Sequence, residues 1–184
     1  MDVEYDHREI DLNDKPEEFI ERSPTGKVPM IVEDDFVLYE SQIINDYLVE
    51  SQGWTGAYPD NLHLKYRQKV CMKQWDSTVL GPVYESLGPS NDLEDAWEDM
   101  EPELEYLWDV ARETDSTDCL LAFHLAPFWA RFSWLQEYTS FPDRVRQIGE
   151  LAEWLDGLLE ESPVRETLPD REWAIEQYEK HYVD

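Results

Sequence analysis

Apolar and polar residues alternate near the start of the chain in a way that indicates short strands. In residues 2–12, isolated apolar residues stand between charged ones, which is typical of a half-buried strand. Two apolar runs follow at residues 28–32 and 36–39, separated by the acidic residues 33–35. Two apolar runs around a short polar turn predict a β-hairpin.

Two helices are expected between and after these strands. Asn13 can cap a short helix that begins at Asp14 and ends before Pro24. Ser41 can cap a second helix, and Gly53 lies where a helix terminator is expected. The apolar face of this second helix consists of Ile43, Ile44, Tyr47 and Leu48. The expected order of elements is therefore βαββα.

From Asn61 onward, apolar residues recur at steps of three and four, which is the pattern of amphipathic helices. Two stripes are especially regular: Leu93, Trp97, Met100, Leu104, Leu107, Trp108 and Ala111, and then Val145, Ile148, Leu151, Leu155 and Leu158. Such stripes pack in a core far more often than they bind a cofactor. We therefore expect a mixed domain over residues 1–52, a linker with Gly and Pro over 53–61, and a helical bundle over 62–184.

The net charge of the chain limits the classes of binding partner that we expect. The 184 residues carry a formal net charge of −28, from 15 Lys and Arg against 43 Asp and Glu. Because such a surface repels phosphates and anionic lipids, we expect no nucleic acid and no membrane partner. In molar salt the Debye length falls to about 3 Å and self-repulsion is screened, which favours a salt-loving source. An ordinary acidic protein in a dilute cytoplasm is the alternative.

Composition indicates a folded cytoplasmic protein. Hydrophobic residues make up 41% of the chain, and no apolar run approaches a membrane span or a signal peptide. The two cysteines, Cys71 and Cys119, form neither a disulfide framework nor a zinc motif, and we expect no metal site. The histidines lack metal-ligand spacing and are expected to be surface or packing residues: His7, His63, His124 and His181.

Residues 26–32 and 36–44 together resemble the glutathione-binding half of the glutathione S-transferase family. The resemblance implies a cis peptide bond between Val28 and Pro29, and a site for a glutathione-type thiol. The site residues that it implies are Lys27, Val28, Pro29, Glu40 and Ser41. The chemistry agrees, because the Glu40 carboxylate can pair with an amino group, while Ser41 Oγ and helix N-terminal amides can hold a carboxylate.

The helical half resembles the C-terminal domain of the same family. Residues 124–132 are similar to its central helix, and residues 163–169 are similar to its usual ending. The expected fold class is thus α+β followed by all-α: an incomplete thioredoxin-like βαββα domain, then an all-helical glutathione S-transferase C-terminal bundle. The family usually forms homodimers, which we expect here as well.

The chain departs from the family pattern at its start. In relatives, a strand and a helix precede the strand expected at residues 2–12, and they hold the Tyr, Ser or Cys that keeps the glutathione sulfur as thiolate. No residue here inherits that role by position, and Tyr5 and Tyr39 are candidates by chemistry alone. Either the true start lies upstream of Met1, which we favour, or this is a shortened relative. The sheet should then show a gap.

A second departure lies before the central helix, where the family carries a capping box that ends in a buried Asp. Residues 119–122 occupy those positions without it, as if about eight residues had been lost between Ala122 and Phe123. Ser116 or Thr117 could cap the helix instead, one turn earlier.

The function expected from this resemblance is that of a glutathione S-transferase-like protein that joins a small thiol to a hydrophobic electrophile. Trp129 and Trp134 are candidates for the electrophile side, although packing is the commoner role of such residues. No cofactor is expected beyond glutathione, or another small thiol, as co-substrate. The alternatives are a non-catalytic interaction or scaffold module and a decayed remnant.

Overall fold

The computed structural model describes residues 3–88, 93–114 and 116–182. The chain forms two compact units, Met1–Ala57 (unit 1) and Tyr58–Asp184 (unit 2). None of the described helices is long and apolar enough to cross a membrane.

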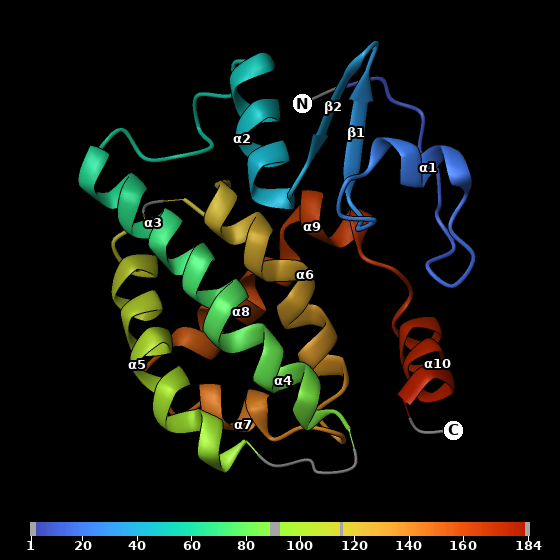
Figure 1. Ribbon diagram of the computed structural model, residues 1–184. Helices are drawn as coiled ribbons and strands as arrows, with labels where there is room; N and C mark the ends of the chain where they lie inside the picture. Colours follow the sequence, from blue (N-terminus) through green and yellow to red (C-terminus); the bar gives the residue numbers. More distant parts are fainter. Residues whose placement is uncertain (1–2, 89–92, 115, 183–184) are drawn as a thin grey trace. The chain divides into compact units, whose positions relative to one another are not determined.

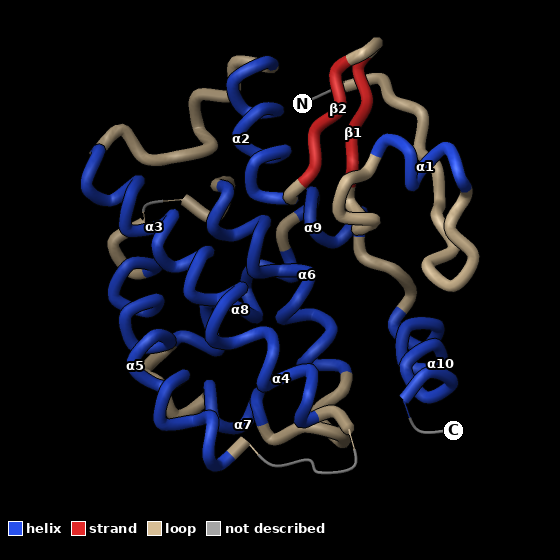
Figure 2. Tube along the Cα trace, viewed as in Figure 1, coloured by secondary structure: helices blue, strands red, loops and turns tan. Residues whose placement is uncertain are grey.

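Unit 1 contains a short hairpin between two helices (Figures 1 and 2). Its elements are α1 (Glu17–Arg22), β1 (Met30–Glu33), β2 (Phe36–Tyr39) and α2 (Ser41–Ser51). The strands pair antiparallel, with Met30 opposite Tyr39 and Glu33 opposite Phe36. Asp34 takes a φ of 53° in the two-residue turn, a conformation that Asp tolerates better than most residues. The hairpin expected from the two apolar runs is therefore confirmed.

The strand expected at residues 2–12 is wrong for the described residues 3–12, which belong to no strand. A strand requires a partner for its backbone groups, and the sheet in the described part contains only β1 and β2. The Asn13 cap is also wrong, because α1 begins three residues later than expected. The Asp11 carboxylate instead accepts a 2.9 Å hydrogen bond from the Asn13 N–H and holds a separate turn.

The second helix begins where expected, with different details. Glu40 occupies the N-cap position with a φ of 71°, and no side chain caps α2, so the Ser41 cap is wrong. Ile44 is 5% exposed and is buried as expected. Ile43 is 53% exposed, so it does not belong to the buried face of α2. Gly53 ends the helix in the left-handed region, as its position predicted.

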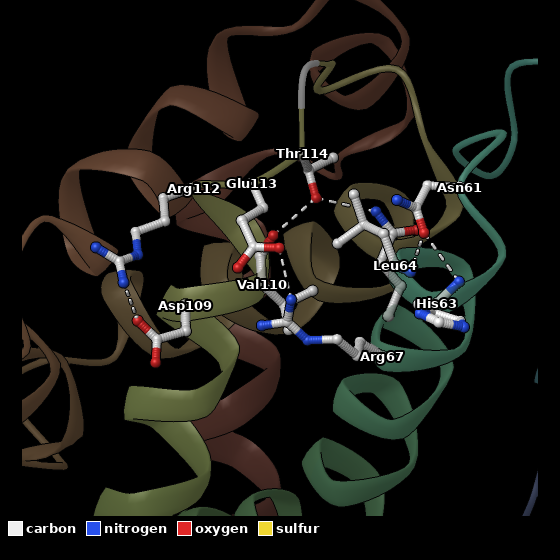
Figure 3. Close-up of polar contacts among 10 residues, drawn as sticks. Asn61, His63, Leu64, Arg67, Asp109, Val110, Arg112, Glu113 and Thr114 are labelled. Carbon is white, nitrogen blue, oxygen red and sulfur yellow. Dashed lines mark hydrogen bonds and ion pairs between the residues drawn. The ribbon is translucent and has the colours of Figure 1, made fainter.

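Unit 2 is helical throughout its described residues. It contains α3 (Leu62–Gln74), the π-helix η1 (Trp75–Val79), α4 (Leu80–Ser86), α5 (Glu94–Ala111), α6 (Leu120–Trp134), α7 (Phe141–Val145), α8 (Leu151–Glu160), α9 (Ser162–Thr167) and α10 (Arg171–Tyr182). The side chain of Asn61 caps α3 by accepting hydrogen bonds from the N–H groups of His63 and Leu64 (Figure 3). Arg67 joins α3 to Glu113 beyond the end of α5 at 2.5 Å (Figure 3).

The core of unit 2 surrounds α6, which contacts α3, α7, α8, α9 and α10 (Figure 1). The α5 stripe packs as expected: Leu93, Met100, Leu104, Leu107 and Ala111 are buried, with Trp97 and Trp108 partly buried against the core. The second stripe is also buried but divides between two helices, because α7 ends at Val145 and α8 begins at Leu151.

The start of α6 differs from the expectation. Cys119 occupies its N-cap position without a side-chain hydrogen bond, so neither Ser116 nor Thr117 is the cap. Ser116 Oγ accepts a hydrogen bond from the Asp118 N–H at 3.0 Å, and Thr117 Oγ1 donates to Glu161 at 2.7 Å. Both hydroxyls are therefore used in other contacts, and neither accepts a hydrogen bond from the first-turn amides of α6.

Gly149 lies at the break between α7 and α8, and a side chain there has no room. Its φ is 50°, and a Cβ atom would lie 2.8 Å from Nε1 of Trp108. We therefore expect Gly149→Ala to lower the free energy of unfolding by about 1 to 3 kcal/mol in molar salt. Denaturant unfolding followed by circular dichroism measures this change.

Gly157 provides the matched control, because it lies inside α8 and an added Cβ atom would meet nothing within 4 Å. Gly157→Ala should stabilise unit 2 by up to about 1 kcal/mol through helix propensity. Equal stability of the Gly149 variant and the unmodified chain would contradict the packing described for this break.

Candidate functional site

The hairpin of unit 1 brings two of the expected site segments together. Residues 27–29 lead into β1, and Glu40 follows β2 directly. Met30 pairs with Tyr39. The residues before Met30 and the residues after Tyr39 therefore lie at the same end of the hairpin. All five expected site residues have exposed side chains. The structure thus brings the Pro29 and Glu40 segments to one accessible edge.

The main chain at Val28 is suited to a peptide ligand. The Val28–Pro29 peptide bond is cis, as the resemblance implied. Val28 precedes β1, so its N–H and C=O groups take no part in the described ladder. Groups of this kind can form two hydrogen bonds to an extended peptide. Next to it, the carbonyl of Lys27 accepts a weak hydrogen bond from Ser23 Oγ at 3.5 Å.

The start of α2 is suited to an anion. The first turn of this 11-residue helix contains no acidic residue and no side-chain cap, and the positive end of the helix dipole favours an anion there. Ser41 lies in that first turn and adds a hydroxyl donor. Glu40, beside it, adds a carboxylate that can hold an ammonium group. Together these groups match the two charges of an α-amino acid.

No described residue near this edge is an activated nucleophile. Tyr5 is 80% exposed, and Tyr39 is partly buried within β2. Sequence reasoning did not single out Tyr47 for chemistry, but its hydroxyl donates to the Glu33 carboxylate and this bond raises the pKa of Tyr47. A phenol with a raised pKa stays neutral and is a donor rather than a base.

The cysteines of unit 2 are not reactive. Both Cys71 and Cys119 are free and buried. Burial raises the pKa of the Cys71 thiol to about 12 and also raises that of Cys119. Since the thiolate is the nucleophilic form, both are packing residues.

Sequence reasoning missed one polar pair, in which the histidine is buried and the aspartate is partly exposed. His124, on α6, lies 2.9 Å from the Asp76 carboxylate on η1, and its side chain is 5% exposed. The two residues are far apart in sequence, so no local spacing could reveal the pair. Among the described residues no cluster of potential metal ligands occurs. The side chain of His181 lies outside the described part of the structure.

Unit 2 also contains a cavity of about 670 Å³ between α4, α6, α9 and α10. Of the two expected tryptophans, Trp134 lines this cavity, whereas Trp129 lies in the core. The Nε1–H group of Trp129 donates to Asp156 at 2.8 Å. The structure therefore separates two residues that the sequence analysis treated alike.

Sequence comparison identifies the first unit. Residues 1–56 match the family model described as the N-terminal domain of glutathione S-transferase. The chain is 34% identical to pyrimidodiazepine synthase of Drosophila melanogaster over 50% of this chain and 39% of that protein. It is 39% identical to a probable glutathione transferase of Aplysia californica, over 28% of this chain and 49% of that protein. It is also 46% identical to a stringent starvation protein A homolog of Haemophilus influenzae, over 26% of this chain and 23% of that protein. The chain spans less than half the length of each of these relatives.

Structural comparison extends over both units. Rice GST1, solved in complex with glutathione, has a TM-score of 0.78 at 18% identity, covering 99% of this chain and 88% of that one. Glutathione transferase Omega 1C of Trametes versicolor has a TM-score of 0.70 at 16% identity, and the match covers 95% of this chain and 84% of that one. The thioredoxin-like first part and the helical second part are confirmed as the fold class. The first 56 residues thus match the N-terminal domain of glutathione S-transferase, and the chain as a whole has the fold of the glutathione transferases.

Proposed function

We propose that unit 1 binds a small thiol of the glutathione type and that the chain serves its conjugation to a hydrophobic electrophile. The observation that supports the proposal best is the hairpin register, which holds the Val28 segment and the uncapped start of α2 at one edge. The complex of rice GST1 with glutathione, a protein of the same fold, adds to it.

Each expected residue has a distinct role in this proposal. The main chain of Val28, set by Pro29, hydrogen-bonds the peptide part of the thiol. The carboxylate of Glu40 holds the ammonium group, and Ser41 with the α2 amides holds the adjacent carboxylate. Lys27 supplies positive charge for the remaining carboxylate of a tripeptide. In a chain of net charge −28, such a cation is needed to offset the general repulsion of an anionic ligand.

The conjugation itself forms a bond between sulfur and an electrophilic carbon, while the thiol proton and any leaving group pass to solvent. Among the described residues of unit 1 we find no group that would lower the pKa of the thiol. Thiol binding is therefore the part of the function that these residues support. A cytoplasmic location, where thiols stay reduced, belongs to the same proposal.

A non-catalytic binding module is the second candidate. It is favoured by the environments of the described tyrosines near the site, because Tyr5 is exposed, Tyr39 is partly buried within β2, and Tyr47 has a raised pKa and stays neutral. The two candidates share the thiol site and differ only in turnover.

The thiol site predicts saturable binding of glutathione and of S-methylglutathione to the full chain in molar KCl. Glu40→Gln removes the charge that holds the ammonium group, and Ser41→Ala removes one donor to the carboxylate. We expect about tenfold weaker binding for the first variant and severalfold weaker binding for the second. Isothermal titration calorimetry measures both.

Glu50→Gln is the matched control, because it makes the same charge change at the other end of α2. It should bind like the unmodified chain. A folded chain that binds neither ligand, or that loses as much affinity in the Glu50 variant as in the Glu40 variant, would refute the thiol site.

A homodimer belongs to the proposal as well. Leu62, Tyr66 and Val70 recur every four residues along α3 and are exposed. The same helix carries four Lys or Arg residues and no acidic residue, in an otherwise acidic chain. An apolar stripe beside cations is complementary to a second copy of this acidic protein.

The net charge predicts that this dimer strengthens with salt, because two subunits of −28 repel each other when unscreened. Sedimentation velocity across a KCl series should show monomers at low salt and dimers in molar salt. Tyr66→Glu should shift the equilibrium towards monomer, while Tyr5→Glu, the same exchange at another exposed tyrosine, should not. A monomer at every salt concentration would disprove the interface.

A further inference from the structure

Helix α2 lies along the hairpin of unit 1 and runs from its open end back towards its turn (Figure 1). The four residue pairs of the hairpin ladder span three steps along a strand, which is about 10 Å. The six helical steps from Ser41 to Tyr47 rise by about 9 Å. Tyr47 therefore reaches the turn end of the hairpin, while the start of α2 stays at the open end.

Two contacts of Tyr47 hold α2 at the turn end. Its hydroxyl donates a hydrogen bond to the carboxylate of Glu33, the last residue of β1. Its ring packs against that of Phe36, the first residue of β2, with centroids 5.4 Å apart. Glu33 and Phe36 are the pair next to the turn. One side chain thus connects the second turn of α2 to both strands of the hairpin.

The rest of α2 is held by a small buried surface. Ile44 is its buried residue, and every other side chain of the helix is half-buried or exposed. One buried contact, a turn from the helix start, fixes the position of a short helix but not its direction. The contacts of Tyr47 supply the second point, which sets where the dipole and the first-turn amides of α2 are aimed. Hydrogen bonds weaken steeply when donor and acceptor are misaligned, so this aim decides how well the helix start holds an anion.

The bond between Tyr47 and Glu33 suits a salt-rich, near-neutral solution. It raises the pKa of Tyr47, so the phenol remains a hydrogen-bond donor well above neutral pH. A hydrogen bond and a ring contact act at short range, where salt screens little. The anchor therefore holds under the conditions in which the acidic chain is expected to bind its ligand.

We propose that Tyr47, through its bond to Glu33, is a positioning residue that aims the start of α2 at the γ-glutamyl carboxylate of the thiol. This role rests on the proposed thiol site, because Tyr47 acts through Ser41 and the α2 amides and not on the ligand itself. Without the hydroxyl those groups remain present but lose their alignment. The affinity that comes from the γ-glutamyl carboxylate is then the part that is lost.

Two ligands separate positioning from general stability. S-methylglutathione carries the γ-glutamyl carboxylate, whereas the analogue with 4-aminobutyryl in place of γ-glutamyl lacks only that group. Tyr47→Phe keeps the ring and removes the hydroxyl. In molar KCl this variant should bind S-methylglutathione about fivefold more weakly and change the affinity for the analogue by less than about twofold. Titration followed by amide NMR measures both affinities.

Glu33 provides the rescue test. Glu33→Gln keeps an acceptor for the Tyr47 hydroxyl and should bind S-methylglutathione like the unmodified chain. Glu33→Leu makes the same charge change without an acceptor and should bind about fivefold more weakly. Adding Tyr47→Phe to Glu33→Leu should bring no further loss, because the two groups form one bond.

Tyr138→Phe is the matched control, because Tyr138 donates to the carboxylate of Glu179 in unit 2 at 2.6 Å. It should leave both affinities unchanged, and near-UV circular dichroism confirms that each variant is folded. Equal losses for the two ligands in Tyr47→Phe, or no loss for either, would overturn the positioning role alone. An unmodified chain that does not bind S-methylglutathione would refute the thiol site and this role with it.

Discussion

The antiparallel pairing of β1 with β2 is the constraint on which the site of unit 1 depends. Because Met30 pairs with Tyr39, the segment that enters β1 and the segment that leaves β2 are held at one end of the hairpin. Helix α2 begins directly after Glu40, so its N-terminus, which no side chain caps, lies at the same end. A slip of one residue would reverse the faces of the strand and separate these groups. One short ladder therefore holds the Val28 backbone beside the start of α2, the two groups to which we assign thiol binding.

Charge sets a second constraint, because any anionic ligand must approach a molecule of net charge −28. The positions of the 15 Lys and Arg residues therefore decide where an anionic group can bind. Lys27 lies beside the proposed thiol site, and α3 carries four Lys or Arg residues and no acidic residue. Molar salt would screen the long-range repulsion while leaving such close contacts largely intact. The acidic surface is therefore compatible with the proposed binding of an anionic thiol in high salt.

Features encoded by neighbouring residues were predictable from the sequence. The hairpin follows from two apolar runs around an acidic turn, and the end of α2 follows from Gly53. The α5 stripe follows from helical periodicity. The helix caps were not predictable in the same way, because the Asp11 carboxylate accepts from the N–H of Asn13 and forms a separate turn there, and α1 begins only at Glu17.

Features that depend on contacts between residues far apart in sequence could not be predicted from the sequence. Residues 3–12 alternate as a strand does, but a strand also needs a neighbour, and the described sheet offers none. The pair of His124 with Asp76 depends on the packing of α6 against η1. The cavity requires four helices to meet, and of its lining residues the sequence analysis singled out only Trp134.

The most direct test of the thiol site is the amide NMR spectrum of the full chain during titration with S-methylglutathione in molar KCl. The geometry predicts that the amide signals of Val28, Ser41 and Gln42 shift progressively and saturate together, while the signals of α6 stay in place. Shifts confined to unit 2, or a spectrum unchanged at saturating ligand, would contradict a thiol site at the hairpin end.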